Sequence, residues 1–322
     1  MSPVPASSAH APASSPRRAL VGALLVAISA IGFGFMPLFN SWTRPDGVGV
    51  AGLLATRFGL AAIVLWTIAL ARREALPRGI TLATLIVMGC VLYFGESFGY
   101  YNALRHLPSG VVALVLYVYP AIVAVLARLV LNEPLTRAKL AALALAAVGL
   151  ALTLGLFGKA TSTPLPSTST QGIAWALLAA VSYAIYMIAG SKTGKRAAPI
   201  MSAAVVATGV ACTLTIVVLA TGDRLPRTQW GWTGAICLAL VGTVLSLTTL
   251  LEGIKRIGPT RAATISCIEP LATAALGAAF LHESMTAMQW LGGGLILAAA
   301  IIATRATSHP PPTVGTADER KP

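Results

Sequence analysis

The residues most capable of chemistry are acidic and aromatic side chains placed inside long apolar stretches. Glu96 lies three residues after Tyr93 and four before Tyr100, so the three side chains share one face of a helix. A carboxylate within an apolar helix usually faces a partner or a water-filled cavity, because its charge is costly to bury in hydrocarbon. Such a face could bind the ammonium group of a solute or carry a proton, with the tyrosines flanking it. The alternative is a protonated Glu96 that hydrogen-bonds a neighbouring helix.

A second carboxylate, Glu269, lies in another apolar stretch, immediately before Pro270. Tyr119 and Pro120 stand 150 positions earlier in the same order. Two polar residues at matching mid-segment positions favour a central site between the segments. Each proline removes a backbone hydrogen bond and crowds the carbonyl group four residues back, so Pro120 and Pro270 are predicted hinges. Prolines that are simply tolerated in apolar helices are the equal alternative.

These prolines belong to an internal repeat with an offset of 150 residues. Residues 107–136 read LPSGVVALVLYVYPAIVAVLARLVLNEPLT, and residues 257–286 read IGPTRAATISCIEPLATAALGAAFLHESMT. Glu133 aligns with Glu283, and both are predicted turn or cap residues. Strict identity is low, but a proline and a later glutamate repeated at one offset are hard to obtain by chance. The sequence therefore indicates one unit written twice.

Composition places the chain in the membrane class. Of its 322 residues, 56% are hydrophobic and 10% charged, against roughly 25% charged in an average soluble domain. The mean hydropathy is +0.80. A membrane-spanning helix needs about 20 apolar residues, and continuous apolar runs exclude the alternating strands of a β-barrel. The ten predicted spans are 19–39, 49–70, 80–104, 109–131, 137–157, 171–190, 199–221, 230–254, 260–281 and 287–304.

The net charge of +13 reflects membrane topology rather than a polyanionic partner. With the N-terminus inside, sixteen of the 23 Lys and Arg residues fall in inside loops and tails, and five fall in outside loops. This imbalance obeys the positive-inside rule and predicts that both termini are cytoplasmic, with no nucleic-acid partner. All four cysteines lie in apolar segments without a CxxC pair, so neither a disulfide nor a metal site is expected.

The linker at residues 158–170 separates five predicted spans from five. The first predicted repeat covers residues 18–157 and the second covers 171–305, with disordered tails at 1–17 and 306–322. An odd number of spans per half places the second half upside down relative to the first. We therefore predict an all-α integral membrane protein with ten transmembrane helices in two inverted five-helix repeats, the architecture of many secondary transporters.

Several of these features resemble the EamA-type permeases of the drug/metabolite transporter superfamily. They are the Arg57-Phe58 pair early in the second span, the mid-helix prolines, the ends LNEPLT and LHESMT, and a glycine-rich fifth span in each half. The resemblance covers the chain except its tails. It implies a permease in the bacterial inner membrane, and members of this size resemble exporters of amino acids and other small metabolites. It also implies a structural role for Arg57, whose position alone predicts either snorkelling to the outer surface or pairing with a carboxylate of the third span.

Tyrosines and intramembrane carboxylates concentrate in a subset of the predicted spans. All seven tyrosines lie in spans 3, 4 and 6, and the carboxylates lie in spans 3, 8 and 9. Since the repeat pairs span 3 with 8, 4 with 9 and 1 with 6, these six spans form the predicted cavity wall. Spans 2, 5, 7 and 10 are predicted to pack or to face lipid. The predicted substrate-binding residues are Tyr93, Glu96, Tyr100, Tyr117, Tyr119, Tyr183, Tyr186 and Glu269.

Residues near the span ends have other predicted roles. Tyr101, near the outer end of span 3, fits an anchor at headgroup level. Glu252, close to Lys255 and Arg256, is a predicted solvated carboxylate. The glycine patch at residues 292–294 could pack within the monomer or across a dimer.

The sequence thus predicts a permease that moves a small amphipathic metabolite, with amino acids favoured, out of the cytoplasm by alternating access. Proton coupling through Glu96 or Glu269 and simple facilitation both stay open, as does import of another metabolite. A multipass membrane enzyme is disfavoured because no HExxH, GxSxG or phosphate-binding glycine loop occurs. A signalling or scaffold protein would have no obvious use for symmetric halves. The expected surroundings are a lipid bilayer, and neither a cofactor nor a metal is expected.

Overall fold

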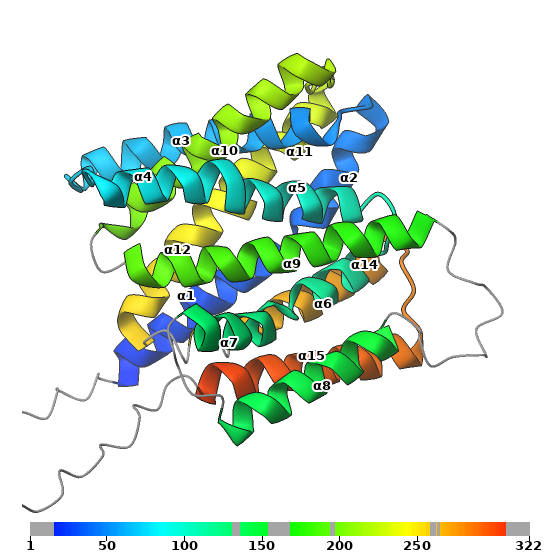
Figure 1. Cartoon of the computed structure of the whole chain (residues 1–322). Coiled ribbons are helices and arrows are strands. Elements are labelled where there is room, and N and C mark those ends of the chain that lie inside the picture. The colour runs from blue at the N-terminus through cyan, green and yellow to red at the C-terminus, as the bar shows by residue number, and fades with distance from the viewer. Residues whose placement is uncertain are drawn as a thin grey trace, which may run out of the picture.

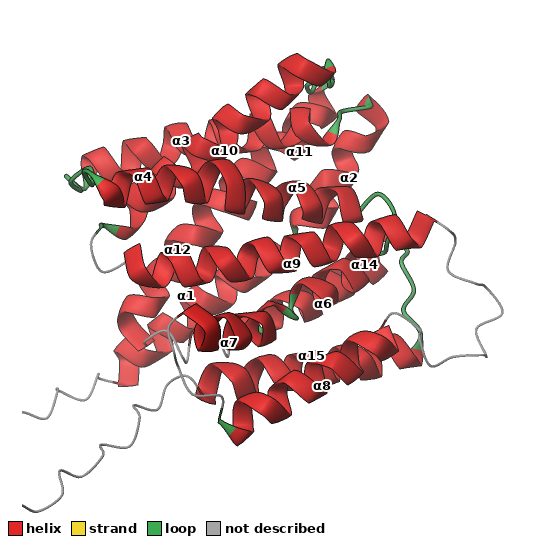
Figure 2. Cartoon of the chain, viewed as in Figure 1, coloured by secondary structure: helices red, strands yellow, loops and turns green. Residues whose placement is uncertain are grey.

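The computed structural model describes residues 16–130, 136–153, 168–193, 197–257, 262 and 265–306. Over these residues the chain is helical and contains no strand (Figure 2). The all-helical class predicted from the sequence is therefore correct. Most of the predicted tails and linker, together with Glu133, lie outside the described residues.

The helices of the first half begin and end close to the predicted spans. The first predicted span breaks at Phe35, just before a helix whose second residue is Pro37, and the third contains one π turn. The elements are α1 (Pro16–Gly34), α2 (Met36–Thr43), η1 (Arg44–Asp46), α3 (Val50–Ala71), α4 (Ile80–Val87), η2 (Met88–Tyr93), α5 (Phe94–Ala103), α6 (Ser109–Leu116), α7 (Tyr119–Val130) and α8 (Arg137–Thr153).

The second half follows the same plan. A π turn again interrupts its third span, within two residues of the position that the repeat predicts. The elements are α9 (Thr168–Thr193), α10 (Pro199–Thr221), α11 (Gln229–Ala239), η3 (Leu240–Leu245), α12 (Ser246–Ile257), α14 (Ile268–Leu281) and α15 (Ala287–Ala306).

Length and composition identify candidate membrane spans among the described residues. Seven helical stretches are long and apolar enough to cross a membrane. Two shorter apolar helices, Ile268–Leu281 and Ala287–Ile302, lie where predicted spans 9 and 10 fall, and α8 covers most of predicted span 5. The chain therefore has several membrane-spanning helices, and the count of ten stays a prediction.

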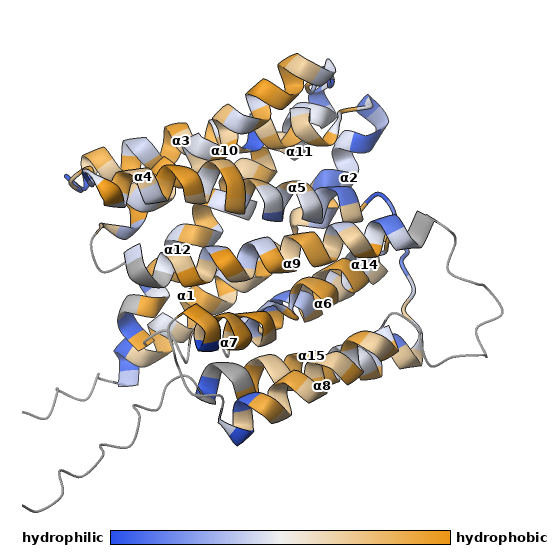
Figure 3. Ribbon diagram, viewed as in Figure 1, coloured by the Kyte–Doolittle hydropathy of each residue, from blue (hydrophilic) through white to orange (hydrophobic). Residues whose placement is uncertain are grey.

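The helices lie roughly side by side, with hydrophobic residues along their lengths and polar residues gathered towards their ends (Figure 3). The start of α1 and the end of α15 lie at the same end of the bundle (Figure 1). This arrangement agrees with a bundle whose helices cross one apolar layer.

The largest helix contacts join a helix of one half to a helix of the other half. The repeat partners α3 and α10 pack extensively against each other at one side of the bundle, and α8 packs in the same way against α15 at the other (Figure 1). Between these pairs, α1 packs on α12 while α5 packs on α9, and α1 contacts α14 while α7 contacts α9. Each of these four contacts between the pairs thus has a counterpart under the repeat.

Reciprocal caps at the helix starts repeat this exchange. Asp223, just after α10, accepts hydrogen bonds from Ala51 N at 2.9 Å and Gly52 N at 3.3 Å in the first turn of α3. Glu74, just after α3, accepts one from Met201 N at 2.7 Å in the first turn of α10. A carboxylate satisfies the free N–H groups of a helix start and complements its dipole. Because positions 51 and 201 are 150 apart, the caps follow the sequence repeat.

Two glycines let α8 and α15 approach at close range. A Cβ added to Gly292 would lie 2.5 Å from Gly149 O, and one added to Gly149 would lie 2.7 Å from Gly292 O. Gly293 faces Leu114 of α6, whereas Gly294 has no neighbour within 4 Å. Two glycines of this patch therefore pack within the monomer.

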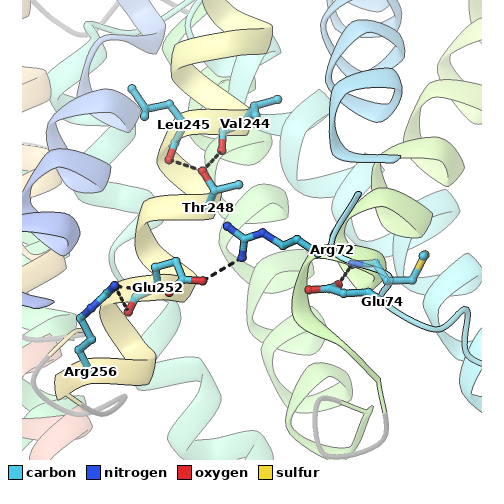
Figure 4. Close-up of polar contacts among 8 residues, drawn as sticks. Arg72, Glu74, Val244, Leu245, Thr248, Glu252 and Arg256 are labelled. Carbon is cyan, nitrogen blue, oxygen red and sulfur yellow. Dashed lines mark hydrogen bonds and ion pairs between the residues drawn. The ribbon is translucent and has the colours of Figure 1, made fainter. Parts of the chain in front are cut away.

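An ion-pair group joins the end of α3 to α12 (Figure 4). Arg72 Nη1 lies 2.9 Å from Glu252 Oε1, and Arg256 Nη1 lies 3.4 Å from Glu252 Oε2. The Glu252 side chain is 27% exposed. It is thus a partly exposed carboxylate paired with two arginines, rather than a freely solvated one.

Candidate functional site

A central cavity of about 250 Å³ lies among helices of both halves. Its lining comes from predicted spans 1, 3, 4, 6, 8 and 9, and none of it comes from α3, α8, α10 or α15. The lining residues are Phe33, Met36, Tyr93, Glu96, Tyr100, Leu116, Tyr117, Tyr119, Tyr183, Met187, Leu250, Ile254, Ala262, Ser266 and Glu269.

The first-half part of the site is one helix face. Tyr93 is the last residue of the π turn η2, and Glu96 and Tyr100 follow it on α5. All three line the cavity. The Ser97 hydroxyl donates a hydrogen bond of 2.7 Å to Glu96 Oε2, so the partner of this carboxyl lies on its own helix rather than on a neighbouring one. The other carboxyl oxygen of Glu96 is available to contact a ligand in the cavity.

The second-half part of the site centres on Glu269, in the first turn of α14. The Tyr117 hydroxyl donates 2.6 Å to Ser266 O and lies 3.1 Å from Glu269 Oε2. Ser266 is four residues before Pro270, so its carbonyl has lost the hydrogen bond that a non-proline helix would give it. Tyr117 therefore replaces the missing donor and holds the Glu269 carboxyl against the cavity.

Five tyrosines form a continuous aromatic wall between these carboxyls. Ring centroids are 5.1 Å apart for Tyr93 and Tyr186, 6.0 Å for Tyr186 and Tyr183, 4.7 Å for Tyr183 and Tyr119, and 5.8 Å for Tyr119 and Tyr117. Offset and edge-to-face pairs at such distances are favourable beyond their burial. Tyr186 lies beside the main cavity and lines a smaller adjoining cavity of about 80 Å³, together with Tyr93 and Tyr183.

Seven of the eight predicted substrate-binding residues therefore line one cavity, and Tyr186 lines the adjoining one. Their role as substrate contacts stays a prediction. Among the described residues, the lining contains two carboxyl groups and no Lys, Arg or His. Carboxyls and aromatic faces both attract an ammonium group, the latter through cation–π contacts. The chemistry available is thus non-covalent binding of a small cationic or zwitterionic solute.

Sequence reasoning missed the apolar half of the lining. Phe33, Met187, Leu250 and Ile254 complete the cavity. The spacing of Leu250 and Ile254 places them on one face of α12, and Met187 lies one turn after Tyr183. Their helical spacing from a predicted lining residue is the sequence signal that could have identified these residues. Nothing in an apolar side chain by itself separates a cavity wall from packing.

Arg57 corrects a prediction. It is 2% exposed and forms no ion pair among the described residues, so it neither reaches the surface nor pairs with a carboxylate. Instead its guanidinium donates to Thr243 Oγ1 at 2.8 Å, Tyr101 Oη at 3.1 Å and Gly242 O at 3.3 Å, and lies 4.7 Å from the Phe58 ring centroid. The π turn η3 presents its backbone and a threonine to this side chain. Arg57 thus ties α3 and α5 to η3.

The same contacts overturn the prediction for Tyr101. It is 2% exposed and accepts a hydrogen bond from Arg57, so it is a buried partner rather than a headgroup anchor. A residue near the predicted end of a span can lie deep in the protein when a loop packs over it. Tyr101 also contacts Tyr100 edge-on, with centroids 5.7 Å apart.

The two predicted hinge prolines lie in equivalent local structures. Pro120 is the second residue of α7, after a turn at Tyr117 and Val118, and Pro270 is the third residue of α14, after a turn at Cys267. Neither proline breaks a hydrogen bond within the helix whose first turn it occupies, although Pro270 leaves the carbonyl of Ser266, before that helix, to be bonded by Tyr117. The chain therefore bends just before each proline, and motion at these bends stays a prediction.

We expect Tyr117→Phe to destabilise the protein by about 1–3 kcal/mol, because the partly buried carbonyl of Ser266 would lose its donor. Tyr119→Phe is the matched control, since the Tyr119 hydroxyl forms no hydrogen bond with the described residues and the ring is retained. Thermal unfolding of both variants in detergent provides the measurement. Equal melting temperatures for the two variants would contradict the role given to the Tyr117 hydroxyl.

Comparison with known proteins places this architecture in a family. The model of the EamA-like transporter family matches residues 20–155 and 170–305, one copy in each half. The uncharacterized transporter YcbK of Bacillus subtilis (strain 168) is 27% identical over 292 residues, which is 86% of this chain and 91% of that protein. The threonine/homoserine exporter RhtA of Escherichia coli (strain K12) is 26% identical over 272 residues, 80% of this chain and 82% of its own.

A solved crystal structure shares the fold, with a TM-score of 0.60 and 20% identity over 89% of this chain and 99% of that one. The resemblance stated from the sequence motifs is confirmed. Since the family model covers both halves and most of the chain, the protein belongs to the EamA-like transporter family and is a multipass membrane transporter.

Proposed function

We propose that this protein exports small amphipathic solutes carrying an ammonium group, with amino acids as the favoured class. The observation that carries the proposal is the presence of Glu96 and Glu269 in one cavity whose described lining has no basic residue. A buried carboxylate is costly unless it meets a cation, a donor or a proton. An ammonium group in the cavity supplies that partner, and the tyrosine wall accommodates the attached carbon chain.

The size of the cavity supports a small solute. A volume of about 250 Å³ is below the usual range for drug-sized ligands, roughly 300–1,000 Å³. The relative named as a threonine/homoserine exporter adds weight to amino acids and to export. The bilayer location that we propose is the bacterial inner membrane, with both termini cytoplasmic.

Transport by alternating access follows from an inverted repeat, which we infer for this chain. The reciprocal caps by Asp223 and Glu74 and the exchanged helix pairs support a pseudo-two-fold axis between the halves. A two-fold axis in the membrane plane exchanges the two halves and the two sides of the membrane. Each half therefore takes, in the outward-open state, approximately the conformation that the other half takes in the inward-open state. The cavity lies where the halves meet, as such transport requires.

Uptake into proteoliposomes tests the proposal. The full chain is reconstituted and offered three labelled panels: amino acids that include threonine and homoserine, the matching amines without a carboxylate, and the matching acids without an amine. We expect saturable uptake of members of the first panel and none of the third. Uptake of the amines alone would narrow the substrate to organic cations. Uptake of the acids alone would overturn the ammonium assignment.

An imposed pH gradient distinguishes proton-coupled transport from facilitated transport without a coupling ion. Faster uptake under the gradient indicates proton coupling, whereas uptake that is indifferent to it indicates a facilitator. Protein-free vesicles and vesicles containing Glu269→Gln provide the background. Direction is read by preloading the vesicles and following efflux under each polarity of the gradient.

A further inference from the structure

A second cavity, of about 510 Å³, lies at the end of the bundle away from the start of α1 and the end of α15 (Figure 1). The loops after α2, α5 and α10 meet there. We call this cavity the arginine pocket, after the arginines among its lining residues. They are Asn40, Arg44, Gly47, Val48, Gly49, Val50, Leu53, Tyr101, Arg105, Thr221, Gly222, Asp223 and Arg224.

Three exposed arginines from three separate loops, Arg44, Arg105 and Arg224, line this pocket. Arg44 Nη2 donates 3.2 Å to Leu104 O, which fixes its direction. None of the three forms an ion pair within the described part of the chain. Each guanidinium has five N–H donors, so most of their hydrogen-bonding capacity faces the pocket or water.

The single carboxylate of the pocket is already engaged. Asp223 Oδ2 accepts the hydrogen bonds from Ala51 N and Gly52 N, and its Oδ1 accepts one from Arg224 N at 3.2 Å. These are the backbone contacts that cap α3 and close the loop. Even with this charge counted, the side chains of the pocket carry a net positive charge of two at neutral pH.

The distribution of basic residues makes this grouping informative. Only five of the 23 basic residues fall in the loops at this end, and four of the five lie in the described part of the chain. Three of those four line the arginine pocket, and Arg227 does not. The loops at this end of the bundle carry few positive charges, and most of those in the described residues line one cavity.

We propose that the arginine pocket binds a small oxyanion, a carboxylate or phosphate group. Guanidinium forks match the oxygens of both groups and form charge-assisted, often bidentate hydrogen bonds. An anion would provide a partner for three arginines that form no ion pair among the described residues. Because they come from separate loops, an oxyanion in the pocket has donors from more than one segment of the chain.

The position of the pocket suggests one source for the carboxylate. Tyr101 lines the arginine pocket, and Tyr100, in ring contact with it, lines the central cavity. The two sites are therefore separated by this tyrosine pair. A transported amino acid would meet the carboxyls of the central cavity through its ammonium group and, at a separate step beyond the tyrosine pair, the arginines through its carboxylate. This source rests on the proposed function, whereas free phosphate as a source does not.

Equilibrium binding to the purified full chain in detergent tests the proposal without any transport. Titration calorimetry uses inorganic phosphate and acetate as oxyanion probes, and methylammonium as a cation of similar size. The variants are Arg105→Gln and Arg224→Gln, and Arg227→Gln is the matched control at the same end of the bundle. Melting temperatures near the wild-type value establish that each variant is folded.

We expect saturable phosphate binding that weakens roughly 10- to 100-fold in Arg105→Gln and Arg224→Gln, the loss of one charge-assisted contact. Arg227→Gln should keep wild-type affinity. If acetate binds and threonine competes with it, the arginine pocket is assigned to the carboxylate of the transported solute. Phosphate binding without acetate binding assigns it to a free phosphate.

Two outcomes would overturn the proposal: no saturable binding of either anion by folded wild-type protein, or equal weakening in Arg227→Gln. The second would show diffuse attraction to a basic surface. Because the measurement involves no transport, failure here leaves the uptake result unchanged. Failure of amino-acid uptake likewise leaves the phosphate titration interpretable.

Discussion

Replacing Glu269 with glutamine is expected to lower the ratio kcat/KM for solute uptake roughly 10- to 100-fold. The change removes one charge but keeps the shape of the side chain. A charge-assisted hydrogen bond contributes about 1.5–3 kcal/mol, and each 1.4 kcal/mol corresponds to a factor of ten. The described lining of the cavity contains no basic residue that would compensate for the loss. Glu96→Gln should act in the same direction, since both carboxyls line the same cavity.

The measurement is the concentration dependence of uptake into proteoliposomes of the wild type and both variants. Glu252→Gln is the matched control, because it removes a carboxyl group that lies outside the cavity and is partly exposed. An exposed ion pair contributes at most about 1 kcal/mol to stability, and uptake by this control should be within roughly twofold of wild type. If Glu269→Gln and Glu96→Gln both took up solute as the wild type does, the central cavity would be excluded as the site that binds the ammonium group.

The pH gradient separates two roles for these carboxyls. If one of them carries the coupled proton, its glutamine variant loses the response of uptake to the gradient, because an amide neither gains nor loses a net proton near neutral pH. If both only contact the solute, the variants raise KM and any gradient response persists. Comparing Glu96→Gln with Glu269→Gln therefore assigns the coupling group or excludes both.

Gly292→Ala is expected to destabilise the protein by about 1–3 kcal/mol, the usual penalty for forcing extra volume into a packed interface. The added Cβ would lie 2.5 Å from both Gly149 O and Thr153 Oγ1, so α8 and α15 would have to separate. Small residues at helix crossings in membranes permit close backbone approach, and that approach supplies the packing energy. Backbone atoms cannot move aside as a flexible side chain would.

Gly294→Ala is the matched control, on the same helix and two residues later. Its added Cβ meets nothing within 4 Å, so no loss of stability is expected. Thermal unfolding in detergent and recovery of monodisperse protein compare the two variants directly. If Gly294→Ala were the more damaging change, the exposed side of this glycine patch would pack against a second copy of the chain rather than lie free.

Much of the architecture is already determined by the sequence. Long apolar runs predict membrane helices because an unsatisfied backbone cannot cross hydrocarbon, and helical periodicity alone places Tyr93, Glu96 and Tyr100 on one face. The 150-residue offset brought Tyr119 and Glu269 to equivalent positions, and both line the central cavity. Local period and internal repetition are properties that one sequence displays by itself.

Only the tertiary structure decided which partners the polar side chains found. Arg57 bonds Thr243 across 186 positions, Tyr117 bonds Ser266 across 149, and Asp223 caps Ala51 across 172. No helical period specifies contacts at such separations, because they depend on how whole helices pack. Arg57, for which its position in the sequence predicted either the surface or a carboxylate partner, is therefore buried without an ion pair among the described residues. The folded chain surrounds its guanidinium with acceptors and aromatic faces, several of which lie far away along the sequence.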